Sequence, residues 1–312
     1  MSAPDTASRP VEARQGRRLL VLLPALLLFL FLTFPGGYAP VRPGLDPSWQ
    51  YALNHLPHSG LQYGTDVTFT YGPLGFLLYP MDIGPNLTIA AGFRLAIHLL
   101  FGLAIAYAGL RIAGLLPALL FMAGYLYSML FGLQYESLLI VTSALWAAVA
   151  IRGKGAGNLF LPPLAVLAAV CLFIKPTLAV SLLSMLGLAE LARLMRGYTR
   201  FYSLLLRSVA PFLIVSTVLW LYWFGSWEPF RAWLLMTLEY IRYNAVAMSL
   251  EGPFSELVIG AACVSAFIVA AVVLVWMRSE VSVVAIVLFP TLFTLFKHGF
   301  ERQDGHVLFF FA

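Results

Sequence analysis

Two carboxylates in the amino-terminal part of the chain could act as proton acceptors. Asp46 and Asp66 both lie in a polar segment that follows the first long apolar run, residues 19–34. A carboxylate at a membrane boundary can take the proton of an acceptor hydroxyl or amine while a second substrate stays anchored in lipid. A structural role is the alternative for both. An aspartate followed by proline, as at position 46, is typical of a helix start with an acidic N-cap, and the Gly-Thr-Asp that ends at Asp66 is ordinary turn chemistry.

Cationic side chains that could bind a phosphate group occur at the edges of later apolar runs. Lys175 stands in the sequence Phe-Ile-Lys-Pro-Thr, and an ammonium group there is costly enough to indicate a partner. Snorkelling of the side chain to the membrane interface is the alternative. A second group follows a later run and comprises Lys297, His298, Arg302 and His306. Arginine offers bidentate contacts to phosphate, lysine a point charge and histidine a proton donor, while a solvated connector is the competing interpretation.

Metal binding is a further hypothesis for this second group. His298, Asp304 and His306 could ligate a divalent cation, but their spacing matches no specific metal motif. The two cysteines, Cys171 and Cys263, lie inside apolar runs. This context favours small buried side chains over a metal site or a disulfide framework.

One cation lies well inside an apolar run. Arg94 falls about two turns from one end of the run 87–110, and His98 follows it on the same helical face. Ionisable residues within spanning segments usually pair with another ionisable group or with backbone carbonyl groups. We expect Arg94 to pair with a carboxylate of the preceding loop or to face the site.

Membrane-spanning helices are the elements that must position these residues. The 312 residues are 61% hydrophobic and only 11% charged, whereas soluble domains carry about 25% charged residues. The mean hydropathy is +0.88. We expect an all-α polytopic membrane protein, because crossing a bilayer takes about 20 apolar residues. The expected spans are 18–34, 87–110, 115–133, 137–151, 159–174, 176–192, 208–224, 255–277 and 281–296, with a tenth that begins near residue 307.

The domain organisation follows from these runs. We expect a disordered cytoplasmic amino-terminus over residues 1–16 and a single transmembrane domain over residues 17–312. The amino-terminal basic and apolar stretch is interpreted as an uncleaved first span, since no convincing cleavage site follows it. The chain stops at Ala312, six residues into the tenth run, so we expect a truncated carboxy-terminus.

Basic residues predict the orientation. With the amino-terminus inside, four amino-terminal arginines and eight later residues, twelve of the nineteen Lys and Arg, fall on the inner side. The eight later residues are Arg111, Arg152, Lys154, Arg193, Arg196, Arg200, Arg207 and Arg278. This placement explains the pI near 9.3 without a nucleic-acid partner. If the runs on either side of Lys175 form one kinked helix, every later segment changes sides.

Two segments expected on the outer side, 35–86 and 225–254, are too long to be simple connectors. In the first, Trp49, Leu53 and Leu56 share one face at helical spacing, which predicts a short helix at the membrane surface. We expect interfacial helices over residues 46–56, 69–79 and 231–248.

The layout of the first outer segment resembles the GT-C class of membrane glycosyltransferases, which includes protein O-mannosyltransferases and lipid A aminoarabinose transferases. The matching stretch runs from Asp46 to Tyr79, with Asp46 at the position of the general base and Tyr71-Gly72-Pro73-Leu74 at the Pro-Leu segment. The sequence departs from the usual acidic pair, because proline follows Asp46. The departure leaves open whether Asp46 works alone, with Asp66 or in no catalytic role.

The resemblance implies sugar transfer from a polyprenyl-phosphate carrier on the outer face of the plasma (inner) membrane. Asp46 would deprotonate the acceptor, and Asp66 would orient it or hold a metal ion. The substrate-binding residues would be Lys175, Arg302, His298, His306, Tyr71 and Arg94. No glycine-rich nucleotide loop, nucleophile elbow or zinc signature occurs, which agrees with a lipid-linked donor and equally with an absence of catalysis.

Two other functions compete with this one. A transporter or flippase of a lipid or polar solute would place its charges near the bilayer midplane, often in repeated halves. An assembly component would have no chemistry of its own, and Asp46 would then lie far from Lys175 and Arg302 with no cavity between them.

Overall fold

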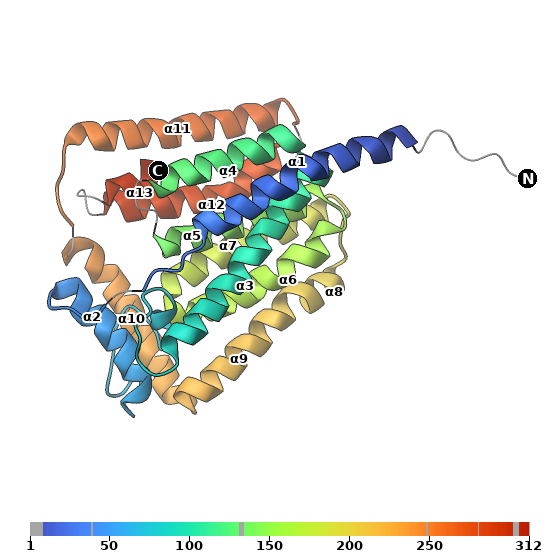
Figure 1. Ribbon diagram of the computed structural model, residues 1–312. Helices are drawn as coiled ribbons and strands as arrows, with labels where there is room; N and C mark the ends of the chain where they lie inside the picture. The colour runs from blue at the N-terminus through green and yellow to red at the C-terminus, as the bar shows by residue number, and fades with distance from the viewer. Residues whose placement is uncertain are drawn as a thin grey trace, which may run out of the picture.

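The computed structural model describes residues 9–38, 40–130, 134–247, 249–279, 281–301 and 306–311 (Figure 1). Within these ranges the chain forms helices and no β-strand. The early helices are α1 (Arg9–Thr33), α2 (Leu45–His55), α3 (Asn86–Tyr107), α4 (Leu115–Met129), α5 (Tyr135–Arg152), α6 (Ala156–Ile174) and α7 (Pro176–Met195). The later helices are α8 (Phe201–Leu204), α9 (Ala210–Phe224), α10 (Trp227–Ala247), α11 (Phe254–Trp276), α12 (Val281–Phe300) and α13 (Val307–Phe311).

Seven helical segments of the described chain are long and apolar enough to cross a membrane, which confirms the all-α polytopic class. They are Asn86–Ile112, Tyr135–Arg152, Ala156–Ile174, Pro176–Met195, Phe201–Phe224, Phe254–Trp276 and Val281–Phe300. The count of nine to ten complete spans is met only in part. The apolar part of α1, Arg18–Thr33, and helix α4 are shorter, and α4 has 15 residues where a crossing takes about 20.

Helices α5, α6 and α7 form the centre of the bundle. They pack against one another, while α3, α9 and α12 cover them. Trp146 of α5, Phe160 of α6 and Met185 of α7 are fully buried in this core. Helices α9 and α11, in contrast, bury little of their surface within the described chain, so they lie at the periphery (Figure 1).

The chain turns back at Lys175 and does not form one kinked helix. The start of α7 lies beside the start of α5, because Lys175 bonds Glu136. The end of α7 lies beside the start of α6, because Arg193 donates to the carbonyl oxygens of Gly153 and Lys154. Helices α6 and α7 are therefore an antiparallel hairpin, and the alternative of a single kinked span is excluded.

The bundle has two chemically different ends. One end carries α2, α10, the start of α5 and Lys175, and we call it the site end. The other end, here the basic end, carries the loops with the eight later basic residues of the orientation prediction. Arg193 joins α7 to the end of α5 there, and the Tyr107 hydroxyl at the end of α3 lies beside Gly153. The structure thus gathers these cations at one end.

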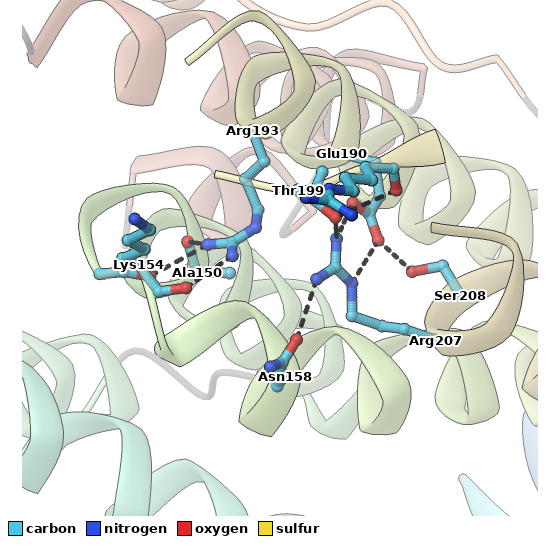
Figure 2. A network of polar contacts seen from close by, with 10 residues as sticks. Ala150, Lys154, Asn158, Glu190, Arg193, Thr199, Arg207 and Ser208 are labelled. Atoms are coloured by element: carbon cyan, nitrogen blue, oxygen red, sulfur yellow. Dashed lines mark hydrogen bonds and ion pairs between the residues drawn. The ribbon is translucent and has the colours of Figure 1, made fainter. Parts of the chain in front are cut away.

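A buried polar network ties three helices together at the basic end (Figure 2). Arg207 lies in the π-helical turn Leu205–Val209 that leads into α9, and its guanidinium group holds both oxygens of Glu190 on α7. It also donates to Asn158 Oδ1 at 3.0 Å, on α6. The Ser208 hydroxyl donates to the same carboxylate. This network fixes the start of the peripheral helix α9 to the core hairpin.

Residues 35–86, which are predicted to lie on the outer side and are called the first outer segment for that reason, are less helical than expected. Helix α2 forms as predicted, but Gly44 and not Asp46 is its N-cap residue, and no side chain caps it. The helix expected over residues 69–79 is absent, and only a short 3₁₀ turn, Gly75–Leu77, occurs. Glycine and proline at positions 72 and 73 interrupt this stretch and divert its backbone hydrogen bonds to α6, as described below. The helix expected over residues 231–248 is confirmed as α10 within its described residues.

Candidate functional site

The break between α6 and α7 presents Lys175 at the site end. Helix α6 ends where the Lys175 amide donates to the Cys171 carbonyl oxygen at 2.8 Å. Pro176 opens α7, a position where the missing proline N–H costs nothing. Lys175 itself is extended, with φ −158°. The backbone geometry therefore turns its side chain out of both helices.

Glu136 is the partner of Lys175. It lies in the first turn of α5, and its two carboxylate oxygens accept from Lys175 Nζ at 2.9 and 3.0 Å. The side chains of Lys175 and Glu136 are only 17% and 11% exposed, respectively. Because so much solvent is excluded, each charge depends on the other, and removal of either would leave the second poorly compensated.

The Tyr71-Gly72-Pro73-Leu74 segment docks on the carboxy-terminal end of α6. The Gly72 amide donates to Ile174 O and the Leu74 amide to Phe173 O, both at 2.9 Å. These carbonyl groups belong to the last turn of the helix, where carbonyl oxygens have no N–H partner within the helix. A Cβ atom on Gly72 would overlap the Phe173 carbonyl oxygen, so only glycine permits this approach.

The docked segment places Tyr71 directly beneath the lysine. Lys175 Nζ lies 5.2 Å from the centroid of the Tyr71 ring, a cation–π distance. Tyr71 also stacks on the ring of Trp49 in α2, with the two ring centroids 5.2 Å apart. Trp49 and Tyr71 also contact Phe69 and Tyr79. We call Trp49, Phe69, Tyr71 and Tyr79 the aromatic wall, and all four are partly exposed.

Asp46 joins the aromatic wall through Trp49. The Trp49 indole N–H donates to Asp46 Oδ1 at 3.0 Å, and the Asp46 side chain stays exposed. Helix α2 is held in this position by Asn54, whose amide group donates to Tyr79 O and whose oxygen accepts from the Met81 amide. Asp46 and Lys175 thus contact two different rings of the aromatic wall, Trp49 and Tyr71 respectively, although they are far apart in sequence.

Burial and the charges of this site keep its tyrosines protonated and its lysine charged. Burial, the nearby charge of Glu136 and that of Asp46 raise the pKa of Tyr71 well above its ordinary value. Burial is also the main cause of a raised pKa at Tyr79. Burial opposes the charge of Lys175, but the charge and hydrogen bonds of Glu136 outweigh it and raise the pKa of the lysine. At neutral pH both phenols stay protonated and the ammonium stays charged.

The carboxy-terminal end of α12 approaches the same site. His298 is close enough to Glu136 for their charges to interact, and its ring lies 5.8 Å from the His306 ring, centroid to centroid. Glu301 acts on the charge of Lys175. Arg302 and Asp304 lie outside the described residues. Among the residues that are described, no cluster of three metal-ligating side chains occurs.

Two of the predicted site residues lie elsewhere. Asp66 accepts a hydrogen bond from the Gln62 amide at 2.9 Å and so closes a turn, beside a loop that packs on α10. Arg94 donates to the backbone oxygens of Pro35, Gly37 and Leu78. It pairs with carbonyl groups of the loop and not with a loop carboxylate. Both residues brace the first outer segment in this structure.

Glu136 is the site residue that the sequence did not single out. The sequence did contain a clue to this pair, because Glu136 stands at the start of one apolar run and Lys175 at the end of a neighbouring run, at the same end of the bundle. Trp49 and Tyr79 were likewise visible as aromatic residues of the first outer segment. Their shared surface depends on the docking of that segment on α6, which no local pattern specifies.

The comparisons with known proteins add no relative. No family model, curated protein or solved structure matches the chain.

Proposed function

We propose that the protein is a membrane glycosyltransferase that moves a sugar from a polyprenyl-phosphate carrier to an acceptor on the extracytoplasmic face. One observation carries the proposal: the Asp46 carboxylate and the Lys175 ammonium converge on one partly exposed aromatic wall at the end of a membrane bundle. A base, a phosphate-binding cation and flat faces suited to sugar rings are the groups that this reaction needs.

The proposed reaction has a simple balance. The acceptor oxygen attacks the anomeric carbon of the donor, and its proton passes to Asp46. The bond between that carbon and the phosphate oxygen breaks, and the electron pair leaves with the phosphate. Lys175 stabilises the charge that develops there, since a preorganised cation acts most strongly where charge forms in the transition state. The products are the glycosylated acceptor and the polyprenyl monophosphate.

The location of the charges favours this function over transport. Transporters hold their substrate and coupling ions near the bilayer midplane, whereas Lys175 and Glu136 lie at helix ends, on the side of α2 and α10. Arg94, the cation deeper within α3, already has three backbone oxygens as partners. Solute uptake into proteoliposomes that depended on Lys175 would support the transporter.

The substitution Asp46→Asn tests the proposed base. Asparagine keeps an oxygen for the Trp49 indole, so α2 and the aromatic wall should stay in place while proton acceptance is lost. Membranes that contain the variant should release polyprenyl monophosphate from polyprenyl-phosphate hexose or pentose donors about 100-fold more slowly than wild type, the usual scale for loss of a general base. Asp66→Asn, which alters only a turn, should retain most of the activity. Full activity in Asp46→Asn would overturn the assignment.

A further inference from the structure

Glu136 occupies the place on Lys175 where an anionic ligand would bind. Its two oxygens accept hydrogen bonds from the ammonium group at 2.9 and 3.0 Å, as two phosphate oxygens would. An ammonium group has three donors, and the geometry devotes it to one carboxylate. A phosphate that approaches over Tyr71 must therefore share Lys175 with a charge of its own sign.

Because Lys175 and Glu136 carry opposite charges, the pair as a whole is neutral, and this affects the affinity of the site for anionic ligands. Lys175 and Glu136 together present no net charge to an incoming anion, and the low exposure of both side chains keeps their fields from being screened by water. The repulsion from Glu136 grows with the charge of the ligand. A phosphodiester carries one negative charge, whereas a phosphate monoester carries about 1.5 to 2 at neutral pH.

We propose that Glu136 is an internal competitor that sets the specificity of the Lys175 site, weakening its hold on phosphate monoesters more than on phosphodiesters. The inference rests on the proposed function, in which the donor is a phosphodiester and the lipid product a monoester. Glu136 then lets the product leave: without it, Lys175 would retain the more highly charged lipid. Glu136 is a positioning and specificity residue and takes no part in bond making.

The competitor is distinct from a mere brace. A brace would hold Lys175 over Tyr71, and its removal would weaken the binding of every anion. A competitor, once removed, frees a cation, and its removal strengthens binding in proportion to ligand charge. The two roles therefore predict opposite signs for the same variant.

Binding of farnesyl monophosphate, a short prenyl monoester, provides the test. Wild type, Glu136→Gln and Lys175→Gln are compared in nanodiscs of neutral lipid, with farnesol as the uncharged probe and a farnesyl phosphodiester as the singly charged one. Glu136→Gln should bind the monoester about tenfold more tightly, the diester about threefold more tightly and farnesol equally. Lys175→Gln should lose affinity for both phosphates.

Glu228→Gln is the matched control. Glu228 also lies in the first turn of a helix at the site end and pairs with a cation, Arg231, at 3.6 Å, but both side chains are mostly exposed. Its loss should leave all three affinities unchanged, because solvent screens the pair. If Glu136→Gln does not fold, Glu136→Asp replaces it. The shorter carboxylate reaches Lys175 less well, so affinity for the monoester should rise about threefold.

The outcomes separate this inference from the proposed function. Weaker monoester binding in Glu136→Gln, with sugar transfer that still depends on Lys175, would refute the competitor role of Glu136 but not the transferase activity. Tighter monoester binding in a protein that transfers no sugar would support the competitor role and refute the transferase activity. Equal affinity for farnesol and farnesyl monophosphate in wild type and in both Gln variants would overturn the anion site itself.

Discussion

Gly72 carries the contact that brings the first outer segment to the break between α6 and α7. Its amide satisfies the Ile174 carbonyl, and its missing side chain lets the Phe173 carbonyl approach. The neighbouring residue, Tyr71, owes its place beneath Lys175 to this backbone contact. A glycine is thus responsible for the geometry of a site in which it has no side chain to contribute.

Gly72→Ala should therefore damage the site without altering any of its functional groups. The new methyl group would meet a backbone oxygen that cannot rotate away, and overpacking of this kind costs about 1–3 kcal/mol. We expect a lower thermal unfolding temperature and at least tenfold slower sugar transfer. Gly92→Ala is the control, because nothing lies within 4 Å of the position that its methyl group would take and alanine favours a helix. Equal activity in the two variants would refute the role of the docking contact.

At the scale of elements, one buried ion pair ties the start of α9 to the core. Helix α9 packs on α6 but buries little of its whole surface. Arg207 and Glu190 have side chains that are only 8% and 3% exposed, and the pair joins the start of α9 to α7. A buried pair of this kind adds specificity of arrangement more surely than net stability, since both charges have lost their water.

Arg207→Met should destabilise the protein by about 3–5 kcal/mol, because it leaves the Glu190 carboxylate buried without a partner. Adding Glu190→Leu should recover much of that loss, since the carboxylate that lost its partner is then removed as well. Thermal unfolding in detergent would measure both effects. Arg231→Ala, which breaks a mostly exposed pair, should change stability by less than about 1 kcal/mol. A double variant no more stable than Arg207→Met would argue that the pair is not the origin of the effect.

At the scale of the whole molecule, the two ends of the bundle differ in kind. The basic end holds arginine and lysine in short connections, while the site end holds long segments with aromatic and acidic residues. Biological membranes favour such cations on the cytoplasmic side. We therefore expect the site end to face outward, with the amino-terminus in the cytoplasm of a cell whose plasma (inner) membrane holds the protein.

Cysteine labelling in intact cells would test this orientation. With Cys171 and Cys263 replaced by serine, Ser48→Cys on α2 and Lys154→Cys at the basic end provide one exposed reporter at each end. A membrane-impermeant maleimide should label position 48 in intact cells and position 154 only after permeabilisation. The reverse pattern would place the site end in the cytoplasm and would exclude sugar transfer on the outer face.

The sequence alone determined the membrane class, most helix positions and the separation of basic from acidic segments. These properties are local, because the length of an apolar run and the residues at its ends set them. It also picked out Asp46, Tyr71 and Lys175 one at a time. It misjudged residues 69–79 as a helix, since helical spacing cannot reveal that the backbone donors there would bond to α6.

Only the tertiary structure decided what those residues face. Lys175 has Glu136 as its partner and Tyr71 beneath it, because helix packing and loop docking bring together residues that are distant along the chain. In the same fold Asp66 closes a turn and Arg94 bonds carbonyl oxygens of the loop, so neither lies at the site. A buried charge must find a partner wherever the fold supplies one, and one-dimensional spacing does not encode which partner that will be.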